Sequence, residues 1–370
     1  RHRLWKVRSK QVILAQGMHE RPLVISGNDI PGVMLSSAVR GYINKYGVIP
    51  GRSVLICTNN DDAYRTAISL HKIGIKITGI VDSRNEQSPD LSKIIKKYNF
   101  KVFLGHVVTS IYGKNNVKSA EIAPISKDAT DISALPFKIS TDLVAMSGGW
   151  TPIVSLFSQS GGKLEWVEKQ GFFKPAKHNQ SNLSVGGSNG NFDFQECVDL
   201  TIKKTNEILT RINKRKNTKF AITASYPNFS YTPRNIWNIP NGRITGKGGK
   251  AFIDFQNDVT VSDIYLASRE GYQSVEHLKR YTTTGMATDQ GKTSNINALA
   301  NLAEILQKPI EEVGTTTFRM PYTPTTLGNI GGRDIKNLFD PIRLTRINEW
   351  HNNHNAKFEH VGQWMRAWYY

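Results

Sequence analysis

The sequence predicts an α/β fold built around a parallel sheet, and two observations predict it. Residues 53–82 have the pattern strand, helix, strand within about 30 residues, which is typical of a βαβ unit. Ligands of open α/β sheets bind at the carboxyl ends of strands, where glycine lets the backbone approach closely. Three short apolar runs each end in such a glycine turn: residues 11–15 before Gly17, residues 143–146 before Gly148, and residues 183–185 before Gly186 and Gly187.

The βαβ unit lacks the usual signature of a nucleotide site. Its first strand, 53–57, leads into loop 58–64, which has no G-x-G-x-x-G and carries two aspartates that would repel a pyrophosphate. Gly74 ends the helix that follows, and strand 75–81 delivers Asp82 to the position of a ribose-binding acid. We therefore predict a structural Rossmann-like unit that binds no nucleotide.

The second half of the chain changes character. A basic helix is predicted around residues 195–216, an irregular linker over 226–248, and short helices between 262 and 313. Within the helical part, residues 285–293 resemble a P-loop but have five residues between the glycines instead of four, and they follow a helix rather than a strand. ATP binding is therefore not predicted. The loop could still offer backbone N–H groups and a cation to a phosphate, and a plain connecting loop is the alternative.

Composition excludes several function classes. The 48 Lys and Arg exceed the 30 Asp and Glu, but the basic residues are spread along the chain, so no nucleic-acid site is predicted. No apolar run is long enough for a membrane span. Cys57 and Cys197 have no CxxC spacing, which favours a cytoplasmic enzyme with buried thiols and predicts no metal site. His351 and His354 are predicted to be surface residues, and no set of catalytic residues stands out.

Several segments resemble known proteins. The segments G-M-H-E-R-P at 17–22 and P-G-V-M at 31–34 are similar to a stretch of flavoproteins that have two dinucleotide-binding domains. The glycine-less loop at 59–64 resembles that of heterotetrameric sarcosine oxidase alpha subunits. Further segments similar to this family are 252–260, 276–283 and 314–319, and the tail at 350–351 and 362–364 resembles the opening of an aminomethyltransferase domain.

The resemblance implies a two-dinucleotide-binding, disulfide-reductase-like flavoprotein fold, followed by a small helical module and the truncated start of an aminomethyltransferase-like domain. Both ends of the sequence are expected to be truncations. The implied domains are 1–52 with 140–225 as part of the first dinucleotide-binding domain, 53–139 as an inserted Rossmann-like domain, 226–248 as a linker, 249–330 as the helical module, and 331–370 as the last domain.

The resemblance also implies an activity. The family oxidatively demethylates sarcosine to glycine, transfers the one-carbon unit to tetrahydrofolate or releases it as formaldehyde, and reduces oxygen to hydrogen peroxide. Its alpha subunit binds NAD, an FMN lies at the alpha–beta interface, FAD sits in the beta subunit, and tetrahydrofolate binds the C-terminal domain. Beta, gamma and delta subunits are the expected partners, and the small-molecule substrate is expected to be oxidised in the beta subunit.

Residues 281–293 form a Thr/Gly-rich loop between two predicted helices, called the Thr/Gly loop below. Nine residues of the glycine turns and of this loop with its flanks are candidates for cofactor contacts: Gly17, Gly148, Gly186, Gly187, Arg280, Thr283, Gly291, Lys292 and Thr293. Three alternatives remain open. One is the alpha subunit of a related imino-acid or opine oxidase or dehydrogenase, and another is an interaction subunit without a cofactor of its own. The third, an NAD(P)-dependent flavin reductase, would need a CxxC pair or an intact second nucleotide loop.

Overall fold

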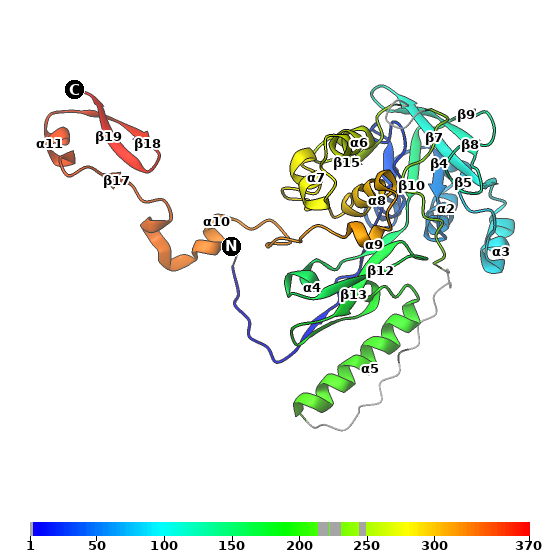
Figure 1. The fold of residues 1–370 in the computed structure, drawn as a ribbon, viewed down its shortest axis with the longest axis horizontal. Coiled ribbons are helices and arrows are strands. Elements are labelled where there is room, and N and C mark those ends of the chain that lie inside the picture. Colours follow the sequence, from blue (N-terminus) through cyan, green and yellow to red (C-terminus); the bar gives the residue numbers. More distant parts are fainter. Residues whose placement is uncertain (1–2, 214–221, 223–230, 244–248) are drawn as a thin grey trace. The chain divides into compact units, whose positions relative to one another are not determined.

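The computed structural model describes residues 3–213, 222, 231–243 and 249–370. The chain divides into two compact units, Lys10–Tyr322 and a second unit made of Arg1–Ser9 with Thr323–Tyr370, and each is described separately (Figure 1). Part of the predicted linker, 226–230 and 244–248, and the end of the predicted basic helix, 214–216, lie outside the described residues. Among the described residues, no helix has both the length and the apolarity that a membrane span requires.

A five-stranded parallel sheet forms the centre of the larger unit, in the order β3-β10-β4-β5-β6. The predicted βαβ unit is confirmed, since β4 and β5 pair in parallel around α2. Two strands from outside the predicted insert 53–139, β3 and β10, complete the sheet, while the domain boundaries themselves stay a prediction. The bounds are β3 Val33–Leu35, β4 Ser53–Thr58, β5 Lys76–Asp82, β6 Val102–Leu104, β10 Leu143–Ser147 and α2 Asp62–Lys72.

Both faces of this sheet are covered, which explains why its strands are continuously apolar. Alternate residues of β4 point to opposite sides, so Val54 and Ile56 pack against α1, α2 and α3 while Leu55 and Cys57 pack against an antiparallel meander. The turn at residues 114–116 joins β7 to β8 of that meander. The bounds are α1 Ser36–Tyr46, α3 Pro89–Tyr98, β7 His106–Gly113, β8 Val117–Pro124 and β9 Phe137–Ser140.

Three two-stranded sheets lie beside the central sheet's strands in the sequence, and the first two contain strands next to the predicted glycine turns. β1 (Val12–Leu14) pairs in parallel with β14 (Asn182–Ser184), β2 (Met18–Glu20) pairs with β11 (Trp150–Pro152), and β12 (Lys163–Val167) pairs with β13 (Phe172–Lys177). Helix α4 (Ser155–Gln159), the short turn η1 (Gly186–Asn189) and the 20-residue helix α5 (Phe194–Asn213) complete this region. Cys57 is buried as predicted, but Cys197, in the first turns of α5, is only half-buried.

The predicted helical module follows. A small hairpin of β15 (Phe252–Asp254) and β16 (Val259–Thr260) leads into α6 (Val261–Arg269), α7 (Val275–Thr282), α8 (Asn295–Leu306) and α9 (Ile310–Val313). Its core, which includes Ile253, Ile264, Leu278 and Leu302, also contacts Val24 and Phe173 of the preceding region. The second compact unit holds α10 (Leu327–Gly331), η2 (Arg333–Phe339), α11 (Asn348–Asn353) and a sheet ordered β17 (Arg343–Leu344), β19 (Trp364–Tyr369), β18 (Lys357–Val361).

Glu20, at the end of β2, caps helix α1 from outside. The residue before the helix, Leu35, offers no side-chain acceptor, and the first turn contains no acid. Instead, the buried carboxylate of Glu20 accepts a hydrogen bond of 2.7 Å from the backbone N–H of Ser37. Its other oxygen has no hydrogen-bond partner among the described residues, and burial raises the pKa of Glu20 to about 7.

The raised pKa of Glu20 predicts a pH-dependent stability. The folded state binds the proton of the Glu20 carboxyl more tightly than the unfolded state does. The free energy of unfolding should therefore fall by about 3 kcal/mol as the pH rises from roughly 4.5 to 7, and it should not change further above pH 7. Glu20→Gln keeps an acceptor for Ser37 and should remove most of this slope in urea unfolding between pH 5 and 8. The exposed Glu86→Gln serves as the control and should keep it. Equal slopes in the Glu20 variant and the parent would contradict the assignment.

Candidate functional site

Two of the predicted glycine turns meet at one edge. β1 and β14 run in register, with Leu14 opposite Ser184, so their carboxyl ends lie side by side. Gly17 adopts a φ of +79°, and a Cβ on Gly187 would lie 2.7 Å from the Met18 side chain and 3.3 Å from the Gly17 Cα. Gly186, with a φ of +62°, begins η1 beside them. The structure thus brings Gly17, Gly186 and Gly187 together at the end of two parallel strands.

This edge has the features of a cradle for a ligand. A Cβ on Gly17 would meet nothing within 4 Å, so open space lies beside its backbone. The side-chain oxygen of the neighbouring Gln16 is shielded from solvent and has no hydrogen-bond partner among the described residues. An orphaned acceptor next to an open glycine turn fits a polar ligand such as a nucleotide.

Gly148 directly follows β10, which is a strand of the central sheet. The Gly148 backbone packs against the segment after β2. A Cβ there would lie 2.7 Å from the Pro22 carbonyl oxygen. The Gly148 N–H donates to the Arg21 carbonyl over 2.7 Å, and the Gly148 carbonyl accepts from the Arg21 guanidinium. Close packing of two backbones therefore accounts for glycine at this position.

The would-be nucleotide site of the βαβ unit is filled by its own side chains. Arg84, itself buried, donates to Asp61 over 2.7 Å and to both carboxylate oxygens of Asp82 over 2.7 and 3.0 Å. Asp82 also accepts from the Tyr64 hydroxyl. Asp82 is thus already paired and cannot bind a ribose without losing these bonds.

A second arginine closes the same end of the sheet. Arg234 donates to the backbone carbonyl of Ser83 over 2.7 Å and to those of Ser126 and Lys127 over 2.8 Å. The Asn59 side chain in the glycine-less loop donates to the Arg234 carbonyl over 2.9 Å. Residues around 234 therefore lie across the strand ends where a dinucleotide would bind in a functional Rossmann unit.

The Thr/Gly loop of the helical module is held at both ends by one buried acid. Asp254 accepts from the Gly285 N–H over 2.7 Å and from the Ser294 hydroxyl over 3.3 Å. The side-chain amide of Asn295 packs against both Gly285 and Gly291, and any side chain at either glycine would overlap it. Sequence analysis assigned no role to Asp254 or Asn295. Asp254 belongs to a segment noted only for its family resemblance, and its partners Gly285 and Ser294 lie 31 and 40 positions away.

The loop presents its predicted contact residues to two different cavities. Gly291, Lys292 and Thr293 line an inner cavity of about 50 Å³. Arg280 lines an outer cavity of about 380 Å³ together with Lys279 and Arg319. Thr283 ends α7 in a left-handed conformation with a φ of +63°. The structure therefore does not bring Lys292 and Arg280 to one site.

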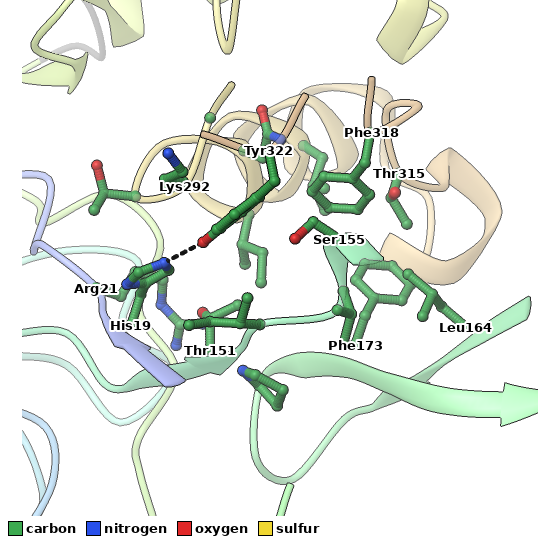
Figure 2. Close-up of a pocket in the computed structure, with 18 residues that line it drawn as sticks. His19, Arg21, Thr151, Ser155, Leu164, Phe173, Lys292, Thr315, Phe318 and Tyr322 are labelled. Carbon is green, nitrogen blue, oxygen red and sulfur yellow. Dashed lines mark hydrogen bonds between the residues drawn. The ribbon is translucent and has the colours of Figure 1, made fainter. Parts of the chain in front are cut away.

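Figure 2 shows the inner cavity, with His19 and Lys292 on the left and Phe318, Phe173 and Leu164 on the right. His19 Nε2 lies 2.9 Å from the Tyr322 hydroxyl, and the Lys292 ammonium lies 4.6 Å from the centre of the Tyr322 ring. Burial, and then the charge of Lys292, lower the pKa of His19, so this ring is neutral at pH 7. Burial raises the pKa of the Tyr322 hydroxyl.

Comparison with known proteins places this architecture in a family. Residues 248–333 match the family model described as "Sarcosine oxidase A3 domain". The chain is 36% identical to the sarcosine oxidase alpha subunit of Corynebacterium sp. (strain P-1), over 100% of this chain and 38% of that protein. It is 37% identical to the sarcosine oxidase alpha subunit of Rhizobium meliloti (strain 1021), over 99% of this chain and 35% of that protein.

Among solved structures, L-proline dehydrogenase from P. horikoshii superposes with a TM-score of 0.62 at 18% identity, covering 88% of this chain and 59% of that one. That likeness concerns the fold alone. The chain spans little more than a third of the length of the sarcosine oxidase alpha subunits that it matches. It is a homologue of the sarcosine oxidase alpha subunits, corresponds to part of one, and combines their A3 domain with an α/β fold like that of L-proline dehydrogenase.

Proposed function

We propose that this chain is part of the alpha subunit of a heterotetrameric sarcosine oxidase. The proposal rests on the extent of the sequence similarity to sarcosine oxidase alpha subunits. That similarity covers 99–100% of the chain and is not confined to the A3 domain. The proposed reaction is oxidative demethylation of sarcosine to glycine, with the one-carbon unit transferred to tetrahydrofolate or released as formaldehyde and oxygen reduced to hydrogen peroxide. Beta, gamma and delta subunits are the proposed partners, in the cytoplasm.

The proposal gives this chain a cofactor-binding role, with oxidation of the amine in the beta subunit, where FAD would bind. NAD is proposed for the edge formed by Gly17, Gly186 and Gly187. The adjacent parallel strand ends and the unpaired Gln16 oxygen support that choice. The βαβ unit, whose Asp82 is already paired with Arg84, is proposed to be a scaffold without a nucleotide.

FMN is proposed at a boundary with the beta subunit, next to the outer cavity. Arg280, Lys279 and Arg319 line that cavity, and the backbone of residues 285–287 turns beside them. Three cations suit a phosphate. Lys292 faces the inner cavity instead, so we propose that it supports the loop rather than contacting the phosphate. Tetrahydrofolate would bind a domain continuing from 331–370.

An opine oxidase is the second candidate function. An opine oxidase protein from Agrobacterium tumefaciens (strain Ach5) is 21% identical over 88% of this chain. That similarity covers 70% of the opine oxidase protein, which is a larger share than for the sarcosine oxidase relatives, but the identity is much lower. The higher identity favours sarcosine oxidase.

The substrate can be tested directly with the complete alpha chain assembled with its proposed partner subunits. We expect sarcosine to drive peroxide formation in a coupled peroxidase assay and an opine to give at most a few per cent of that rate. Adding tetrahydrofolate should lower the formaldehyde released per glycine formed. A preference for the opine would support the second candidate, and turnover of neither would contradict both.

The nucleotide site predicts a stoichiometry of one NAD per alpha subunit. Gly187→Ala together with Met18→Ala removes the side chain that the new Cβ would meet, so loss of NAD in this double variant would come from obstruction of the edge. We expect NAD released by denaturation to drop several-fold. The control is Gly41→Ala, in the open on α1, which should retain one NAD. Two NAD per subunit, or full retention in the double variant, would contradict the assignment.

The outer cavity predicts a role for Arg280 in retaining FMN. Removing one desolvated, charge-assisted contact should weaken retention by on the order of 1–3 kcal/mol, or roughly five- to 150-fold. Arg280→Ala should therefore lose FMN during gel filtration of the alpha–beta complex at moderate salt, while the exposed Lys308→Ala keeps it. Thermal melting of the isolated alpha subunit should not change. Equal FMN content in both variants would exclude a phosphate contact at this cavity.

A further inference from the structure

The inner cavity is lined by two cationic groups, Arg21 and Lys292, for which the described residues provide no ion-pair partner. Arg21 is buried, and its guanidinium donates to the backbone carbonyls of Gly148 and Gly171 and to the Thr151 hydroxyl. Among the described residues, no carboxylate forms an ion pair with Arg21 or with Lys292. Asp289 lies close enough to interact with the charge of Lys292 and with its backbone N–H, but the two side chains form no ion pair. A desolvated cation without an anion is costly, so an anionic ligand here would lower the free energy of the folded protein.

Ser155 supplies an independent sign of a missing ligand. Its side chain is 3% exposed and lines the cavity, and its hydroxyl has no hydrogen-bond partner among the described residues. Figure 2 shows this hydroxyl between the polar and the apolar sides of the cavity. A buried hydroxyl without a partner is uncommon, and a ligand oxygen at this position would satisfy it.

The rest of the wall is apolar and sets the size of the ligand. Leu164, Phe173 and Phe318 line the side away from His19 and Lys292 (Figure 2), and Leu299 also lines the cavity. The cavity volume of about 50 Å³ is far too small for a nucleotide, but it admits a few heavy atoms, since a single water needs roughly 10–15 Å³ on the same measure. The ligand should therefore be short, with one charged end and one apolar end.

We propose that the inner cavity binds a small monocarboxylate. Its carboxylate would lie between Lys292, Arg21 and Ser155, and a short alkyl group would contact Phe318 and Phe173. An amino acid fits less well, because its ammonium group would meet either the cations or the apolar wall. The proposal does not rest on the proposed oxidase activity, since every residue that it uses belongs to one compact unit of this chain.

Propionate is the probe that tests this site on the 370-residue chain. Isothermal titration should show saturable binding of one propionate per chain, and propionamide, which has the same shape without the charge, should bind at least tenfold more weakly. Lys292→Met should weaken propionate binding at least tenfold and Ser155→Ala several-fold. Lys279→Met is the matched control, since Lys279 lines the outer cavity, and it should leave propionate binding unchanged.

Each remaining outcome decides against the proposal. Equal affinity for propionate and propionamide would show that the charge is not recognised, and no heat with either would show that the cavity is dry or holds only water. Equal loss in Lys292→Met and Lys279→Met would indicate nonspecific attraction to a basic protein. If Lys292→Met does not fold by circular dichroism, Phe318→Trp, which fills the apolar side, and Ser155→Ala give the answer. Unchanged affinity in both would overturn the site.

Discussion

The packing of Arg21 is the constraint on which the rest of the larger unit depends. Its backbone exchanges hydrogen bonds with the Gly148-Gly149 turn, and its guanidinium reaches the Gly148 and Gly171 carbonyls while lying 4.8 Å over the Trp237 ring. One side chain therefore fixes the end of β2, the turn after β10 and the start of β13. Both the glycine edge at Gly17 and the inner cavity are built on these segments, so their geometry depends on this arginine.

The regular elements could be predicted from the sequence because their signals are local. The apolar run at 53–57, the helix ending near Gly74 and the following strand appear in the structure as β4, α2 and β5. The close approach of Gly17 and Gly187 could also be anticipated, since parallel strands with glycine turns place those turns at one edge. Hydrophobic period and turn residues are sufficient for inferences of this kind.

The contacts that distinguish the sites could not be predicted, because they join residues far apart in the chain. Asp254 binds residues 31 and 40 positions away, and His19 meets Tyr322 across 303 positions. The sequence placed Arg280 and Lys292 in one candidate site because both flank the Thr/Gly loop. The fold turns them to different cavities, since the loop is pinned between Asp254 and Asn295. The sequence shows that loop 58–64 of the βαβ unit lacks the glycine motif. It does not show that Arg84 pairs with Asp61 and Asp82 at the position of a nucleotide.

The contact between His19 and Tyr322 has a consequence for how the larger unit opens. Tyr322 is the last residue of that unit, and His19 lies in its second strand, so the hydrogen bond joins the two ends of a 313-residue segment. Asn28 reinforces this connection by pairing with both backbone groups of Phe252. Detachment of the early strands would therefore break contacts with the helical module. Amide hydrogens of β2 and of α8 should belong to one cooperative opening unit and not to two independent ones.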